Sequence, residues 1–146
     1  MEYASASMGR ILVARFDHGE DLLAGLRGLL AKEGIAHAVI LLLGALEEGL
    51  VVTGPEEPVI PPVPHFVHFG GGWELVGVAT AYPGEDGPDI HLHVSAGRGE
   101  RALTGCLRQK AQTYLVAEAV IFELSGLHVR RNRDGKTGLV LPDFTR

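Results

Sequence analysis

The stretch 89–95, Asp-Ile-His-Leu-His-Val-Ser, alternates between apolar and polar residues and therefore predicts a β-strand. Successive side chains of a strand point to opposite faces, so its three apolar residues share one face, while His91, His93 and Ser95 share the other. The apolar face is expected to enter a core. The two imidazoles then lie side by side, about 6–7 Å apart along the strand, as half of a candidate metal site.

A metal site needs more ligands than two imidazoles. Cys106 is the candidate third ligand, because the chain can turn after His93 and return beside the strand. Two imidazoles and a thiolate suit Zn²⁺ and leave a fourth position for water or a substrate. A zinc-bound water ionises near neutral pH, so such a site could support hydrolysis. The alternative is structural, because a lone cysteine is usually a small buried apolar residue.

Length and composition predict one compact domain with a substantial core, because 46% of the 146 residues are hydrophobic. Residues 1–9 lack the basic and apolar regions of a secretion signal and are expected to be a disordered lead-in to a domain over 10–146. No apolar run reaches the length of a membrane span. The single cysteine fits a reducing cytoplasm. The net charge of −5 makes the chain a poor non-specific partner for nucleic acids.

The N-terminal part of the chain predicts a strand followed by a helix. Residues 10–16 alternate as a strand does, and the leucines that follow recur at helical intervals over residues 20–33. Asp17, with Glu20 three residues later, has the spacing of a capping box. Gly34 is a natural helix stop.

The rest of the chain predicts strands joined by turns. The uninterrupted apolar run 36–43 predicts a central strand covered on both faces, followed by a turn at 44–46. Five prolines within residues 55–64 predict an extended loop, because proline cannot donate to a sheet ladder. Residues 101–109 fit either a strand or one helical turn. Further strands and hairpins are predicted at residues 66–69, 73–81 (the hairpin partner of the histidine strand), 114–124 and 128–141.

Together these segments predict an α+β fold. We expect a single domain with a largely antiparallel central β-sheet, one main amphipathic helix near the N-terminus and short additional helical turns. The sequence contains no Gly-x-Ser-x-Gly, dinucleotide-binding or paired-carboxylate motif.

Glu118 is the one carboxylate that the pattern places on a face expected to be buried, among Val116 and Val120. A buried carboxylate needs a partner or a raised pKa. Arg15 is the candidate partner if their strands are neighbours. A structural ion pair is the first interpretation of Glu118, and general-base catalysis is the second.

Other polar residues give weaker indications of a site. His65 and His68 follow the proline-rich segment and are expected to be solvent-exposed loop histidines. The basic run near the C-terminus predicts a solvated turn rather than a phosphate contact; it consists of Arg130, Arg131, Arg133 and Lys136.

Short motifs occur in a characteristic order at 19–23 (Gly-Glu-Asp-Leu-Leu), 34–35 (Gly-Ile), 44–46 (Gly-Ala-Leu), 91–95 (His-Leu-His-Val-Ser), 105–107 (Gly-Cys-Leu), 117–121 (Ala-Glu-Ala-Val-Ile) and 137–139 (Thr-Gly-Leu). In this order the chain resembles the PPC domain, the plants-and-prokaryotes domain that plant AT-hook proteins carry. The resemblance spans about residues 10–141. It implies an α+β fold with a central antiparallel sheet, assembled as a homotrimer.

The resemblance also implies a metal site. Some bacterial and archaeal members carry a metal, typically zinc, on the His-x-His pair and a third histidine in a Gly-Gly-His-Leu motif. Here residues 104–107 read Thr-Gly-Cys-Leu, so Cys106 takes the third position beside His91 and His93. Plant members bind A·T-rich DNA through an Arg-Gly-Arg-Pro arm. Residues 97–100 read Gly-Arg-Gly-Glu and lack the second Arg and the Pro, so DNA is not the expected partner.

Three functions follow as hypotheses. The first is a non-catalytic, trimeric PPC domain that binds a metal ion such as zinc, or a small ligand, at His91, His93 and Cys106. The second is a zinc-dependent hydrolase-like enzyme with Glu118 as its candidate catalytic base. The third is association with DNA, as labels in the family suggest.

Overall fold

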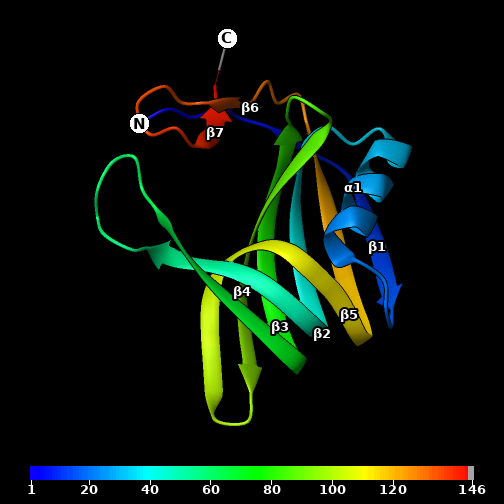
Figure 1. Ribbon diagram of the computed structural model, residues 1–146. Coiled ribbons are helices and arrows are strands. Elements are labelled where there is room, and N and C mark those ends of the chain that lie inside the picture. The colour runs from blue at the N-terminus through cyan, green and yellow to red at the C-terminus, as the bar shows by residue number, and fades with distance from the viewer. Residues whose placement is uncertain (145–146) are drawn as a thin grey trace.

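The computed structural model describes residues 1–144 and shows a long, strongly curved sheet with one helix packed on it (Figure 1). Strand β1 begins at Ser7, within the stretch expected to be a lead-in. No helix among the described residues is long and apolar enough to span a membrane. The elements in chain order are β1 (Ser7–Asp17), α1 (Leu22–Glu33), β2 (Ala38–Pro55), β3 (Pro64–Pro83), β4 (Pro88–Arg98), β5 (Arg101–Ser125), β6 (Arg130–Arg133) and β7 (Val140–Asp143).

Strand β5 closes the main sheet. The strand order is β1-β5-β2-β3-β4, every pairing is antiparallel, and β5 also pairs with β4. The C-terminal part of β5 lies between β1 and β2, while its N-terminal part lies between β2 and β4. Four strands therefore curl into a barrel at one end, while β1 extends the sheet at the other (Figure 1).

The predicted α+β class is wrong. Strands hold 65% of the described residues and helix only 8%, and α1 is the single helix among them. The expected additional helical turns are absent from this part of the chain, and residues 101–109 belong to β5. The turn predicted at residues 44–46 is absent, because β2 continues through them with a shift in its register against β5. Strand β3 likewise continues through its three consecutive glycines at 70–72 with a shift in register.

Helix α1 confirms the predicted helix, with a different N-terminal cap. The side chain of Asp21, not Asp17, accepts a hydrogen bond from the backbone N–H of Ala24 at 2.8 Å. Gly34 ends the helix in the left-handed conformation, as expected, with φ 65°. Four leucines of α1 are buried against the sheet: Leu22, Leu23, Leu26 and Leu30.

The sheet is covered on one face only, contrary to the prediction for residues 36–43. In β2, Ile40 and Leu42 enter the core beneath α1, while Leu41 and Leu43 are 44% and 53% exposed. The alternation continues across neighbouring strands, because residues that pair in a ladder share a face. Most of the outer face is therefore left uncovered by the described residues.

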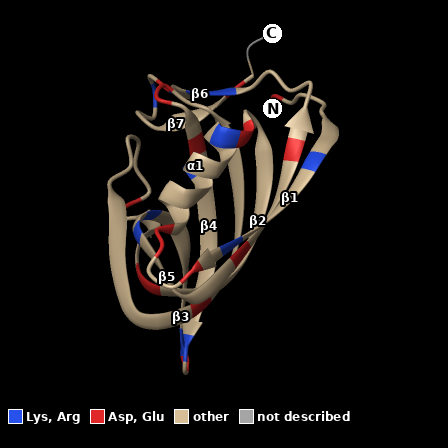
Figure 2. Cartoon of the chain, turned by 90° about the vertical axis from the view of Figure 1, so that its right-hand side faces the viewer, with Lys and Arg blue, Asp and Glu red and all other residues tan. Residues whose placement is uncertain are grey.

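The C-terminal hairpin confirms the prediction for residues 128–141. Strands β6 and β7 pair as a separate two-stranded sheet at the end of the molecule where the N-terminus lies (Figures 1 and 2). Its turn is fastened by Asp134, whose carboxylate accepts hydrogen bonds from the backbone N–H and the hydroxyl of Thr137. The proline-rich loop between β2 and β3 also matches the prediction.

Gly44 lets β2 and β5 approach closely at the register Gly44–Ala117. Its φ is +135°, and a Cβ there would lie 2.5 Å from Ala117 Cα and from the carbonyl oxygen of Val116. We expect Gly44→Ala to lower the free energy of unfolding by about 2–5 kcal/mol, from backbone strain together with overpacking. Urea denaturation would measure this, and unchanged stability would contradict the account.

Gly28 provides the matched control for this substitution. It lies within α1, with no heavy atom within 4 Å of an added Cβ. Gly28→Ala is expected to raise the free energy of unfolding by about 0.5–1 kcal/mol, because alanine has the higher helix propensity.

Arg10 and Glu123 tie β1 to β5 through an ion pair with an N–O distance of 2.8 Å. The hydrogen bond from the Arg10 side chain lowers the pKa of Glu123 from 4.5 to about 2. Because the folded-state pKa is the lower one, the pair stabilises the fold above pH 4.5 and loses this effect as the pH falls toward 2. Glu123→Gln is therefore expected to be less stable than the wild type at pH 7, with a difference that shrinks through this window. Urea unfolding at several pH values would test it, and a difference independent of pH would contradict it.

Candidate metal centre

Strand β4 presents both candidate histidines on the outer face of the sheet, opposite the core. The register pairs His91 with Thr80 and His93 with Val78 of β3. Between them, Leu92 points the other way and is fully buried in the core. The alternation of the sequence therefore predicts correctly that the two imidazoles share a face.

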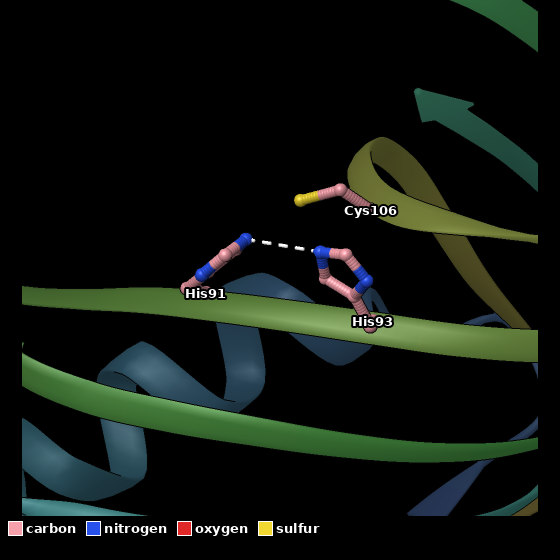
Figure 3. A group of neighbouring side chains, drawn as sticks. All are labelled: His91, His93 and Cys106. Carbon is pink, nitrogen blue, oxygen red and sulfur yellow. Dashed lines mark hydrogen bonds between the residues drawn. The ribbon is translucent and has the colours of Figure 1, made fainter. Parts of the chain in front are cut away.

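Cys106 reaches the same place from β5. The β4–β5 ladder pairs it directly with His93, so both residues lie on one face of the sheet. Gly105 beside it allows the close approach of β2, since a Cβ at Gly105 would lie 2.5 Å from the carbonyl oxygen of Val52. Figure 3 shows the sulfur of Cys106 above the space between the two rings.

The three side chains converge on one small volume. The Nε2 atoms of His91 and His93 are 3.1 Å apart, and their ring planes meet at 81°. One ligand atom from each residue lies within 4.8 Å of the others. Ligands at tetrahedral zinc, with Zn–N of 2.0–2.1 Å and Zn–S of 2.3 Å, stand about 3.3–3.8 Å apart. The nitrogen pair, at 3.1 Å, falls a few tenths of an ångström short of this spacing. The widest separation, 4.8 Å, would have to shrink by about 1 Å, a shift of the size that a change in side-chain torsion produces.

Burial and nearby arginines set the protonation of the ligands. The pKa of His91 is lowered, first by burial and then by the charge of Arg131. The neutral imidazole, which can coordinate a metal, is therefore favoured. Burial raises the pKa of the Cys106 thiol, against the opposing effect of Arg108. A metal ion must consequently displace the thiol proton as it binds.

Glu118 does not join this group, and the prediction that it is buried is wrong. It is exposed on the outer face, opposite Arg15 of β1 and Leu43 of β2. The carboxylate partner of Arg15 is Asp17, at 2.9 Å. Strands β2 and β3 separate Glu118 from the histidines of β4, a distance of about 14 Å at the usual strand spacing.

His65 and His68 are exposed, as expected, although they lie in β3 rather than in a loop. His65 contacts Glu56 at 2.8 Å, and His68 contacts Glu48 at 3.3 Å. Each of these imidazoles therefore has its own carboxylate partner away from the His91–His93 pair.

Arg131 departs from the solvated turn predicted for the basic run. Its residue is only 6% exposed, and a terminal nitrogen donates to the hydroxyl of Thr80 at 2.9 Å. Thr80 pairs with His91, so this guanidinium lies next to the candidate ligand His91. Arg130 and Arg133 are exposed, as predicted. The sequence does not distinguish the buried Arg131 from these two exposed arginines, so its burial could not be predicted.

The profile of the Plants and Prokaryotes Conserved (PCC) domain, also written PPC, matches residues 3–125. The chain belongs to this family. The PPC resemblance inferred from short motifs is thereby confirmed. Among curated proteins the chain has no match.

Solved structures share the whole fold. A PPC protein from Pyrococcus horikoshii is 28% identical, with a TM-score of 0.86 over 100% of this chain and 99% of that one. A metal-containing protein from Archaeoglobus fulgidus is 23% identical, with a TM-score of 0.85 over 97% and 98%. A protein from Ralstonia eutropha, named as a candidate DNA-binding protein, is 16% identical, with a TM-score of 0.77 over 91% and 90%. The similarity to the last two of these structures shows the fold of this chain.

Proposed function

We propose that this PPC domain binds one zinc ion per chain through His91, His93 and Cys106 and works as a binding protein rather than an enzyme. The observation that carries the proposal is the convergence of two imidazole nitrogens and one sulfur within 4.8 Å. The metal-containing relative from Archaeoglobus fulgidus supports a metal in this fold.

The donor set favours zinc. Thiolate and imidazole ligands together suit Zn²⁺ better than the oxygen-seeking Mg²⁺ or Ca²⁺. When bound, zinc would supply a Lewis acid with one open coordination position. Within the chain, β4 places both imidazoles on one face, and β5 brings the Cys106 sulfur within 4.8 Å of their nitrogens. Glu118 lies too far away to act as the base that the hydrolase hypothesis requires.

Removing a ligand should remove the metal. We expect the purified wild type to hold about one zinc per chain, and His91→Ala or Cys106→Ala to weaken zinc binding at least about tenfold, a loss of 1.4 kcal/mol or more. Zinc content by mass spectrometry and competition with a chromophoric chelator measure this. His68→Ala is the matched control, because His68 is exposed and pairs with Glu48. Equal zinc binding by all four proteins would refute the ligand set.

Self-association is the second part of the proposal, and its partner is a second copy of this chain. Apolar residues lie side by side across the outer face, in the ladder order Val13, Val120, Leu41 and Val78. Val13 is 75% exposed and Val78 is 56% exposed. Monomeric proteins rarely expose contiguous apolar surface of this kind, which usually marks an interface. The family resemblance supplies the number of copies, a homotrimer.

A charge on this face should separate the copies. The wild type is expected to run at three times the 15.6 kDa mass of one chain, and Leu41→Asp to dissociate because a carboxylate would be desolvated at the interface. Light scattering coupled to size exclusion measures the mass. Val59→Asp, an equally apolar and exposed position in the proline-rich loop, is the control. A monomeric wild type, or the same mass for both variants, would contradict the assignment.

The cell compartment and partners follow from the same chemistry. A single free thiol that serves as a ligand needs reducing conditions, so we place the protein in the cytoplasm. The net charge of −5 favours a metal or small-molecule role over contact with DNA phosphates.

A further inference from the structure

We infer that the metal centre adjoins a pocket for a small oxyanion, a carboxylate or phosphate group, that Arg131 and Arg108 recognise. This inference rests on the proposed function, because it names the class of ligand that reaches the same site. The pocket is a cavity of about 290 Å³ between the histidine strand and the segment that leads into β7. His91, Asp89, Arg108, Arg131 and Leu139 are among the residues that line it.

Arg131 is the central observation. Its guanidinium is buried, and its Nε has no hydrogen-bond acceptor. The nearest carboxylate oxygen, on Asp89, is 3.8 Å from that nitrogen, beyond hydrogen-bond length. One terminal nitrogen donates to Thr80, and the guanidinium carbon lies 5.4 Å from the centre of the Tyr82 ring. A buried cation without a full set of partners is costly, and an oxyanion in the cavity that Arg131 lines would offset its charge.

The charges around the cavity favour an anion. Arg108 and Arg131 bring two positive charges to its wall, and Asp89 brings one negative charge. A zinc ion held by two neutral imidazoles and one thiolate adds a further net positive charge next to it. The planar guanidinium of arginine can donate two parallel hydrogen bonds to the two oxygens of a carboxylate or phosphate. The compact ammonium group of lysine does not match this geometry.

The size of the cavity limits the ligand. At about 290 Å³ it lies at the lower end of small-molecule pockets, so it suits a molecule of few atoms. Leu139 and Ile90 supply apolar walls that can contact the rest of such a ligand. Since His91 lines both the cavity and the metal centre, one ligand can contact the arginines and lie beside the metal.

Titration of the zinc-loaded protein with inorganic phosphate, and separately with acetate, tests the inference. Ionic strength is held constant with sodium chloride, so that only the oxyanion changes. We expect a saturable rise in melting temperature with at least one of the two, and the anion that binds more tightly identifies the group. Arg108→Gln, at an exposed position, is expected to raise the dissociation constant about tenfold. Arg131→Lys keeps the charge but loses the fork and should also weaken binding.

The control is Arg15→Gln, which makes the same charge change on β1, where Arg15 pairs with Asp17. Circular dichroism confirms that each variant is folded. If neither anion saturates the wild type, or if Arg108→Gln binds as the control does, the inference is overturned. Zinc content measured in the same samples separates the two proposals. Full zinc without anion binding overturns the pocket alone, whereas anion binding to a protein without zinc supports the pocket and overturns the metal centre.

Discussion

The closure of the sheet by β5 is the constraint on which the other features depend. A strand of 25 residues pairs with β1, β2 and β4 in turn, and it can do so only because it bends. Lys110 and Leu115 adopt positive φ values of 54° and 59° along it, where the ladder with β2 shifts register. The closest approaches of the β2 and β5 backbones use Gly44 and Gly105, where an added Cβ would lie 2.5 Å from backbone atoms of the neighbouring strand. Without this closure Cys106 would not lie opposite His93.

One-sided burial is the second consequence of this architecture. A single helix covers the inner face of the sheet, and the barrel end packs on itself. On the outer face, the described residues of the C-terminal hairpin cover only the end around Thr80 and His91. The candidate metal ligands and the apolar row Val13, Val120, Leu41 and Val78 occupy this same face. Under the two proposals made above, self-association and zinc binding, the assembled protein would hold several metal ions in a fixed arrangement.

The surroundings of His91 and Cys106 have opposing effects on the ability of these two residues to coordinate a metal. Burial favours a neutral His91, which helps coordination, and it raises the pKa of Cys106, which opposes it. The arginines nearby lower the pKa of both groups and so favour the neutral imidazole and the thiolate at once. Arg108 and Arg131 consequently favour, through their charge, the forms of His91 and Cys106 that can coordinate a metal, and both arginines also line the adjoining cavity.

The sequence by itself determined what depends on local periodicity and on residue type. Alternation over 89–95 placed His91 and His93 on one face, the leucine spacing and Gly34 set the helix, and the prolines set the loop after β2. Only the tertiary structure decided which face of residues 114–124 is buried, because both faces of that strand are apolar and packing under α1 selects the one with the small alanines. The same holds for the continuity of β2 and β3 through their glycines, for the burial of Arg131 and for the register that pairs Cys106 with His93. Each depends on contacts between segments far apart in the chain, which a local pattern does not encode.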